Sequence, residues 1–242
     1  MKLIKSTSVP ASYCDSDVKL SVVGAFQIVE DLVTEMMGDL HIDGLVCMKE
    51  YGAMWLFVRN RIEMPRPLKW KEEYSSECYI SSVGKGRMNI DTVLKNMDKE
   101  IAAVSRLELC AIDLQTFRLR KMDTVGFDGS ITAEVPEYNI TFRRGKFTPS
   151  TLLDTVTVRS SDIDYCHHTN NISYIRFLMN QWSVDELSTR PVRAIEVQYA
   201  GQTHEGDILQ IYNSEKNRDD DAGEGFVICH NDAVILNCLV CR

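Results

Sequence analysis

The sequence lacks any apolar run that approaches the roughly 20 residues needed to span a bilayer. Its first residues, 1–6, are also too short of apolar side chains to form the core of a signal peptide. We therefore expect no membrane span and a cytoplasmic location. The low-hydrophobicity signature of disordered proteins is absent as well, because 44% of the 242 residues are hydrophobic and 26% are charged. This length allows one large domain or two domains of roughly 120 residues each.

An excess of positive charge is also missing, since the formal net charge is −8. Proteins that coat nucleic acid draw their affinity from clustered lysine and arginine, so we expect no nucleic-acid partner. Two local basic stretches remain, in residues 59–71 and at Arg143-Arg144-Gly145-Lys146. Each would suit docking of an acidic partner or would form a solvated strand edge.

Cysteines are plentiful, but their spacing is not that of a disulfide framework or a zinc site. A structural zinc usually takes four ligands in two close pairs, which the cluster of Cys166, His167 and His168 does not provide. Cys238 and Cys241 are three residues apart in a strand-like segment and would face opposite sides of a sheet. We expect no metal site, and we expect reduced thiols, most of them packed as small hydrophobes. The eight cysteines are Cys14, Cys47, Cys78, Cys110, Cys166, Cys229, Cys238 and Cys241.

Apolar periodicity divides the chain into two similar halves. In the first half, apolar residues recur every three or four positions from Val22 to Met36, which predicts a helix capped by Ser21. Later runs predict strands at 56–64, 74–81, 88–95 and 101–113. In the second half, the same patterns predict a helix over 172–182 and strands at 195–199, 208–212, 226–229 and 233–240.

The two halves share an order of elements. Each helix follows a short segment rich in Ser and Asp, at 15–17 and 161–164, and the stretch 123–149 between the halves has the glycines and prolines of a connection. We therefore predict an internal duplication of an α+β unit, in which one helix packs on a curved antiparallel sheet. Two such units could join edge to edge into one long sheet.

The most polar cluster lies directly before the second helix, in residues 161–171. Its sequence is Ser-Asp-Ile-Asp-Tyr-Cys-His-His-Thr-Asn-Asn. At a helix N-terminus, exposed N–H groups and the positive end of the dipole can stabilise developing negative charge, so the segment suits oxyanion chemistry. The alternative is that Asn170 or Asn171 only caps the helix and that the rest is an exposed loop.

This segment resembles the acyl-acyl-carrier-protein (acyl-ACP) thioesterases of plants and bacteria, which carry Asp-x-Asn-x-His-x-Asn-Asn before a helix. The matching residues here run from Asp164 to Asn171 and continue into the helix as far as Ile175. Weaker matches follow in order along nearly the whole chain, at Leu20-Ser21, 55–64, Trp70 and 199–207. The resemblance implies a tandem hotdog fold, with an N-terminal hotdog and connecting segment in residues 1–136 and a catalytic C-terminal hotdog in residues 137–242.

The resemblance also implies an activity, namely hydrolysis of acyl-ACP to a free fatty acid and the thiol of the carrier protein, without a cofactor. Asp164 and His168 match the family, whereas Cys166 stands in place of its Asn and Gln202 in place of its Glu. A neutral amide cannot accept a proton, so Asp164 or His168 would be the general base and Gln202 would position the water. In a further variant, Cys166 is a nucleophile activated by His168.

The other implied sites are an oxyanion site and an acyl pocket. Backbone N–H groups near Asn170 and Asn171 would hold the oxyanion. The N-terminal hotdog would shape the acyl pocket, and we expect one face of the first helix to set chain length through Val22, Phe26, Val29 and Leu32. Ordinary core packing is the alternative role for these side chains.

The residues are compatible with three alternatives. The replacements at Cys166 and Gln202 also suit a weakened or inactive tandem hotdog that only binds acyl chains. The carrier could be coenzyme A in place of the acyl carrier protein. Two fused hotdogs supply the pairing that single hotdogs obtain by dimerising, so we expect a monomer or a homodimer.

Overall fold

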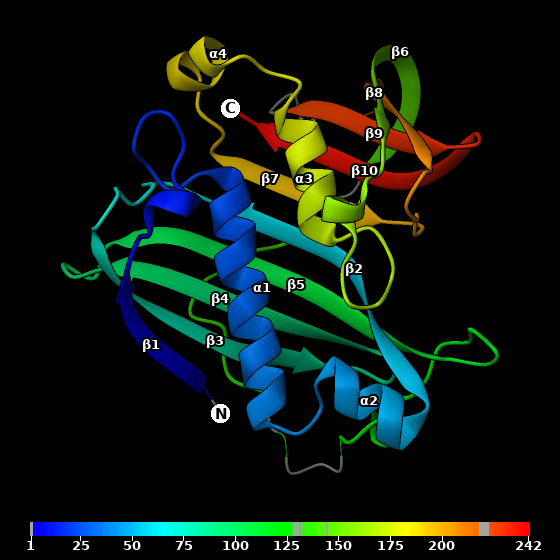
Figure 1. Ribbon diagram of the computed structural model, residues 1–242. Helices are drawn as coiled ribbons and strands as arrows, with labels where there is room; N and C mark the ends of the chain where they lie inside the picture. The colour runs from blue at the N-terminus through cyan, green and yellow to red at the C-terminus, as the bar shows by residue number, and fades with distance from the viewer. Residues whose placement is uncertain (1, 128–130, 132, 144, 218–222) are drawn as a thin grey trace.

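The computed structural model describes residues 2–127, 131, 133–143, 145–217 and 223–242. A single 10-stranded antiparallel sheet carries helices on one face (Figure 1). The first half contains β1 (Lys2–Ser8), α1 (Val22–Asp39), α2 (Gly44–Tyr51), β2 (Ala53–Glu63), β3 (Glu73–Val83), β4 (Arg87–Asn96) and β5 (Ile101–Asp113). The second half contains β6 (Lys146–Thr157), α3 (Asn171–Met179), α4 (Val184–Thr189), β7 (Ala194–Tyr199), β8 (Ile208–Asn217), β9 (Glu224–His230) and β10 (Ala233–Cys241).

The strand order repeats between the two halves. It runs β1-β3-β4-β5-β2 in the first half and, read from its own outer edge, β6-β8-β9-β10-β7 in the second. The halves meet where β2 pairs with β7, so that Arg59 lies opposite Gln198 and Glu63 opposite Ala194. The predicted edge-to-edge joining of two α+β units into one sheet is therefore confirmed.

The local signals in the sequence account for the central elements. The Ser21 hydroxyl accepts a hydrogen bond from the Gly24 N–H at 2.9 Å, which caps α1 as predicted. Phe26, Val29 and Val33 form part of its buried face. At the β9–β10 turn, Asn231 and Asp232 both have positive φ, as a tight hairpin between twisted strands requires.

Four helices and strands were absent from the sequence-based expectation, and one of them, α4, buries no residue. The strands β1 and β6 form the two outer edges of the sheet, and their side chains are mostly exposed, so they lack an apolar repeat. The first residues of β6, 146–149, lie in the stretch predicted to be a connection, which corrects that boundary. The short helix α2 buries only Cys47, too little for a periodic signal.

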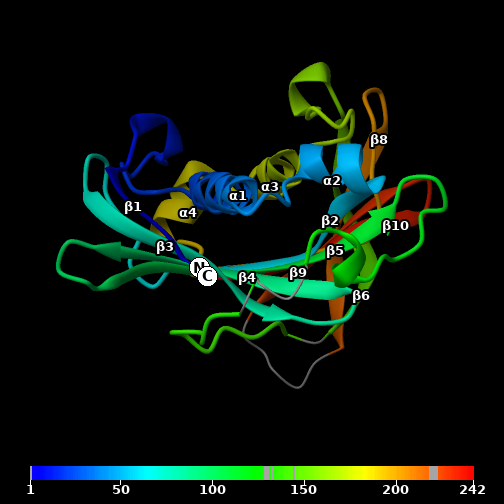
Figure 2. The same cartoon turned by 90° about the horizontal axis from the view of Figure 1, so that it is seen from below.

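Residues 133–143 of the connection cross the opposite face of the sheet. Figure 2 shows α1, α2 and α3 on one side of the sheet and this segment on the other. Ile140 packs there with Tyr79, Val93 and Val104 in a small second core. Gly129 and Arg144, which belong to the predicted connection and basic stretch, lie outside the described residues.

Burial of most of the cysteines agrees with the sequence-based expectation. Most of the cysteines are buried as thiols, namely Cys47, Cys78, Cys110, Cys229 and Cys238. Among the described residues, no helix is both long enough and apolar enough to cross a membrane.

A buried ion pair reinforces the junction of the two halves. On β2, Arg61 donates to Glu196 of β7 at 3.2 Å, and both side chains are more than 90% shielded from solvent. Arg61 also donates twice to Glu63, at 2.5 and 2.8 Å, while Glu196 accepts the N–H of Arg143 at 2.9 Å. A buried pair is tolerated only when its remaining donors and acceptors are satisfied, and these contacts satisfy them.

Replacing Glu196 by alanine should therefore destabilise the protein strongly, because the Arg61 guanidinium would stay buried with one partner fewer. We expect the free energy of unfolding to fall by about 3 kcal/mol in a urea titration. The matched control is Glu35→Ala, which removes the exposed pair between Glu35 and Lys5 and should cost less than about 1 kcal/mol. Equal losses in the two variants would contradict a stabilising role for the junction pair.

Candidate active site

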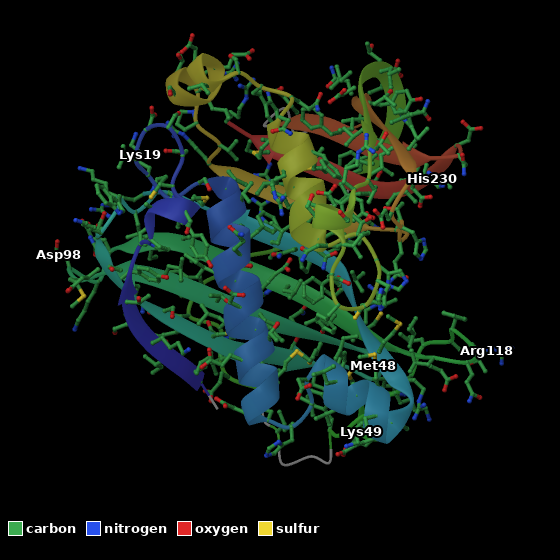
Figure 3. The ribbon with its side chains drawn as sticks, in the orientation of Figure 1. Lys19, Met48, Lys49, Asp98, Arg118 and His230 are labelled. Atoms are coloured by element: carbon green, nitrogen blue, oxygen red, sulfur yellow. The ribbon has the colours of Figure 1, made fainter. Side chains whose placement is uncertain are left out.

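A cavity of about 490 Å³ lies between the helices and the sheet, within the range of about 300–1,000 Å³ typical of ligand sites. Both halves of the chain line it. The first half contributes Glu30, Val33, Thr34, Met37, Asp43, Gly44, Met48, Met54, Trp55, Leu56, Phe57, Val58, Leu109 and Cys110. The second half contributes Asp164, Tyr165, Cys166, His168, Thr169, Asn170, Asn171, Tyr174, Tyr199, Ala200, Gly201 and Gln202. Figure 3 labels Met48, on α2 beside β2.

A tight turn brings Asp164 and His168 to the same cavity. The Asp164 N–H donates to the His168 carbonyl at 2.9 Å, and the His167 N–H donates to the Asp164 carbonyl at 3.0 Å. One carboxylate oxygen of Asp164 accepts the Cys166 N–H at 2.8 Å. His167 has a φ of 63°, a left-handed conformation that closes the turn.

Buried hydroxyls anchor this turn to the segment that carries Gln202. The Thr169 N–H donates to the Thr203 carbonyl at 2.8 Å, and their side-chain oxygens lie 2.7 Å apart. The Tyr174 hydroxyl lies 2.7 Å from the Thr203 hydroxyl. The network fixes the loop before α3 against the end of β7. The sequence gives no role to Thr203, and it places Tyr174 in the matching stretch without a function, because isolated hydroxyls carry no local signal.

The first half contains a copy of the turn. The Asp15 N–H donates to the Lys19 carbonyl at 2.8 Å, the Asp15 carboxylate accepts the Asp17 N–H at 2.9 Å, and Val18 has a φ of 61°. Lys19, labelled in Figure 3, thus takes the place that His168 has in the second half. The copy lies away from the cavity and has no imidazole.

His168 is set up to be a neutral imidazole. Its Nδ1 atom is buried and has no hydrogen-bond partner among the described residues. Burial lowers the pKa of His168, and the nearby rings of His204 and His167 lower it further, whereas the charge of Asp164 opposes the shift. The His204 ring lies 5.0 Å from that of His168 between centroids. A neutral imidazole can accept a proton from water.

The environment of Cys166 disfavours the thiolate form that a nucleophile needs. Burial raises the pKa of its thiol, and the negative charge of Asp164 raises it further. A reactive cysteine requires a lowered pKa, so this environment argues against the nucleophile variant. In the described part of the chain, no three His, Cys, Asp or Glu side chains are grouped as metal ligands.

Asn170, Asn171 and Gln202 all line the cavity, but their hydrogen-bonding groups differ in availability. The Asn170 side chain accepts the Ile172 N–H at 2.8 Å, so it caps α3, as the simpler alternative proposed. The Asn170 N–H donates to the Asp162 carbonyl at 2.7 Å. Asn171 is the first residue of α3, and Gln202 is an exposed side chain at the cavity edge.

The four residues expected to form the acyl pocket lie elsewhere on α1. Phe26, Val29 and Leu32 are buried in the main core, Val22 packs against that core, and none of them lines this cavity. The wall that α1 contributes begins at Glu30, between Val29 and Leu32, and consists of Glu30, Val33, Thr34 and Met37. The periodicity identified the buried stripe, but it could not separate core positions from cavity positions.

Two further ionisable side chains line the cavity. One carboxyl oxygen of Glu30, Oε1, is buried. Burial, together with the charges of Asp31 and Asp164, raises the pKa of this carboxyl to about 8. Burial raises the pKa of Tyr199 well above its usual range, with a smaller contribution from Glu30. Glu30 was missed by the sequence analysis, because a single acidic residue within an apolar helical repeat resembles a surface position.

Comparison with known proteins gives a sequence match over part of the chain and structural matches over nearly all of it. Residues 148–238 match the family model for the acyl-ACP thioesterase C-terminal domain. No curated protein matches the sequence. The resemblance indicated by residues 164–175 is thus confirmed in the half of the chain that contains them.

Two crystal structures illustrate the likeness of the whole fold. An acyl-ACP thioesterase from Bacteroides thetaiotaomicron aligns with a TM-score of 0.89 at 17% identity, covering 99% of this chain and 97% of that one. The 12:0-ACP thioesterase from Umbellularia californica aligns with a TM-score of 0.84 at 17% identity, covering 99% and 96%. At such low identity the likeness establishes the tandem hotdog fold.

The raised pKa of Glu30 predicts how stability depends on pH. The carboxyl has a pKa of about 8 when folded and about 4.3 when unfolded, so its contribution to stability is present at low pH and is lost as the pH rises toward 8. Glu30→Gln removes this loss. We therefore expect Glu30→Gln to gain Tm relative to the wild type as the pH is raised from 5 to 8. Differential scanning calorimetry of both proteins at each pH measures this difference. An equal increase in Glu35→Gln, on the exposed side of α1, would contradict this explanation.

Proposed function

We propose that the protein is an acyl-ACP thioesterase, a hydrolase that cleaves the thioester of an acylated carrier protein to a free fatty acid and a thiol. The family match over residues 148–238 and the tandem hotdog fold support the activity. The observation that carries the assignment to this cavity is that Asp164, His168 and Gln202 line it together with apolar side chains of the other half. No cofactor is needed for this reaction.

In the proposed mechanism, His168 is the general base. Its lowered pKa keeps the imidazole neutral at pH 7, so it can take a proton from the attacking water. The water oxygen bonds to the carbonyl carbon, the carbon–sulfur bond then breaks, and the imidazolium returns the proton to the leaving thiolate. The charge of Asp164 stabilises the imidazolium, and the amide of Gln202 positions the water.

The acyl chain would occupy the apolar part of the cavity. Val33 and Met37 from α1, Met48 from α2 and Met54 from β2 supply apolar wall there. These residues belong to the proposed N-terminal hotdog, residues 1–136. The loop at 164–170, called the catalytic loop below, belongs to the proposed C-terminal hotdog, residues 137–242. Substrate selection and chemistry would thus come mainly from different halves.

The choice of carrier is the finer part of this proposal. The basic stretch at 59–71 offers less free charge than its sequence indicates, because Arg61 is paired with Glu63 and Glu196. Arg66 is likewise paired with Glu72. A competition between acyl carrier protein and coenzyme A thioesters would decide the carrier. The cytoplasmic location, the role in fatty acid biosynthesis and the monomeric or homodimeric state belong to the same proposal.

Removal of the His168 imidazole tests the proposed chemistry. His168→Ala should reduce thiol release from acyl-ACP by about 10²–10⁴-fold, because general-base assistance typically contributes that much. The matched control is His230→Ala, at a histidine on the β9–β10 hairpin outside the cavity (Figure 3), which should keep full activity. Full activity in His168→Ala would reject the assignment of the base.

Filling the cavity tests the acyl site. Met48→Trp should move the preference toward shorter acyl chains, because each methylene that can no longer be buried loses about 0.8 kcal/mol. The control is Leu45→Trp, which adds the same ring at an exposed position of α2. The measurement is kcat/KM across a series of acyl-ACP chain lengths. An unchanged preference in Met48→Trp would place the acyl chain elsewhere.

A further inference from the structure

The backbone around α3 offers few donors for an oxyanion. Of the N–H groups at Asn170, Asn171 and Ile172, the first donates to Asp162 and the third to the Asn170 side chain. Among the described residues, only the Asn171 N–H of these three is left without a partner. Oxyanion holes usually combine several preorganised donors, so the cavity needs more than this single group.

Two unpartnered polar atoms line the same cavity. The Oε1 atom of Glu30 on α1 and the hydroxyl of Tyr199 at the end of β7 are buried, and neither has a hydrogen-bond partner within the described part of the chain. Buried polar groups are nearly always hydrogen-bonded, and an exception in a cavity commonly marks a place for a ligand group or a water. Glu30 and Tyr199 are near enough that Glu30 affects the titration of Tyr199.

The surroundings of Glu30 keep it protonated at neutral pH. Burial is the main cause, and the nearest acids act in the same direction, namely Asp31 on its own helix and Asp164 on the catalytic loop. Arg176 on α3 and Tyr13 line a neighbouring hollow with Glu30. The other titratable groups of the cavity around it include Asp43, His168, Tyr174 and Tyr199. With a pKa of about 8, the carboxyl is mostly neutral at pH 7 and can donate a hydrogen bond.

We propose that the neutral carboxylic acid of Glu30 and the hydroxyl of Tyr199 donate hydrogen bonds to the carbonyl oxygen of the bound thioester. Together with the Asn171 N–H, they form the oxyanion hole. This inference rests on the proposed thioesterase function and adds to it a catalytic residue from the N-terminal half. Neither donor transfers its proton, because the proton that His168 takes from water goes to the leaving thiolate.

The variant Glu30→Gln distinguishes this role from that of a base. Glutamine keeps a donor of nearly the same shape, but it cannot ionise and cannot accept a proton. We expect kcat of the wild type to fall as the pH rises through about 8, because ionised Glu30 no longer donates. Glu30→Gln should keep turnover at pH 7 within a few fold of the wild type and should lose this alkaline decline.

Variants that remove the donors should lower kcat at every pH. Tyr199→Phe and Glu30→Leu should each reduce kcat by about 10²-fold with little change in KM, because they remove a contact that strengthens in the transition state. Glu35→Gln, an exposed position on the same helix, should match the wild type. Thermal melts establish that each variant is folded; if Glu30→Leu is not, the comparison of pH profiles for Glu30→Gln still decides.

The outcomes separate this inference from the function on which it rests. No thiol release by the wild type from any acyl-ACP or acyl-CoA would overturn the proposed function and the oxyanion hole together. An active wild type with an inactive Glu30→Gln would make Glu30 a base and overturn its role as a donor. Wild-type kcat in both Tyr199→Phe and Glu30→Leu, or an alkaline decline that persists in Glu30→Gln, would overturn the oxyanion hole and leave the thioesterase intact.

Discussion

The pairing of β2 with β7 is the constraint on which the rest of the structure depends. It turns two five-stranded units into one sheet and brings α1 of the first half beside α3 of the second. The cavity exists because of this junction, since its floor comes from β2 and its polar side from the loop before α3. The buried pair of Arg61 and Glu196 crosses the same junction, so the contacts that hold the halves together also hold the site together.

The cavity environment favours the neutral form of one base, His168, and of one acid, Glu30. Burial lowers the pKa of the cationic acid form of His168 and raises the pKa of Glu30, so both side chains are mainly uncharged at pH 7. One neutral group can then accept a proton while the other can donate a hydrogen bond. Such a separation by environment allows acid and base roles to coexist in a single small volume.

The sequence predicted the central architecture because its signals are local. The cap at Ser21, the apolar repeat of α1 and the strand β5 all follow from neighbouring residues and agree with the structure. The edge strands β1 and β6 were not predicted, because a strand that buries little carries no apolar alternation.

The polar segment at 161–171 was identified from its composition, and seven of its residues, 164–166 and 168–171, line a cavity. The place of Glu30 could not be predicted, because it depends on how α1 is rotated against the sheet and against α3, which begins 141 residues after Glu30 at Asn171. The same limit explains why Val22 and Phe26 were expected in the acyl pocket. Both belong to the apolar stripe, and only the tertiary arrangement shows which part of that stripe faces the core.

The copied turn at Asp15–Lys19 shows what fusion of two hotdogs permits. In an assembly of identical subunits, every substitution appears twice, so a residue that helps one position must be tolerated at its symmetry mate. A single chain is free of that restriction, and here the same backbone geometry carries lysine in one copy and histidine in the other. Because the two halves need not be identical, the first half can hold a substrate without carrying the residues that react with it.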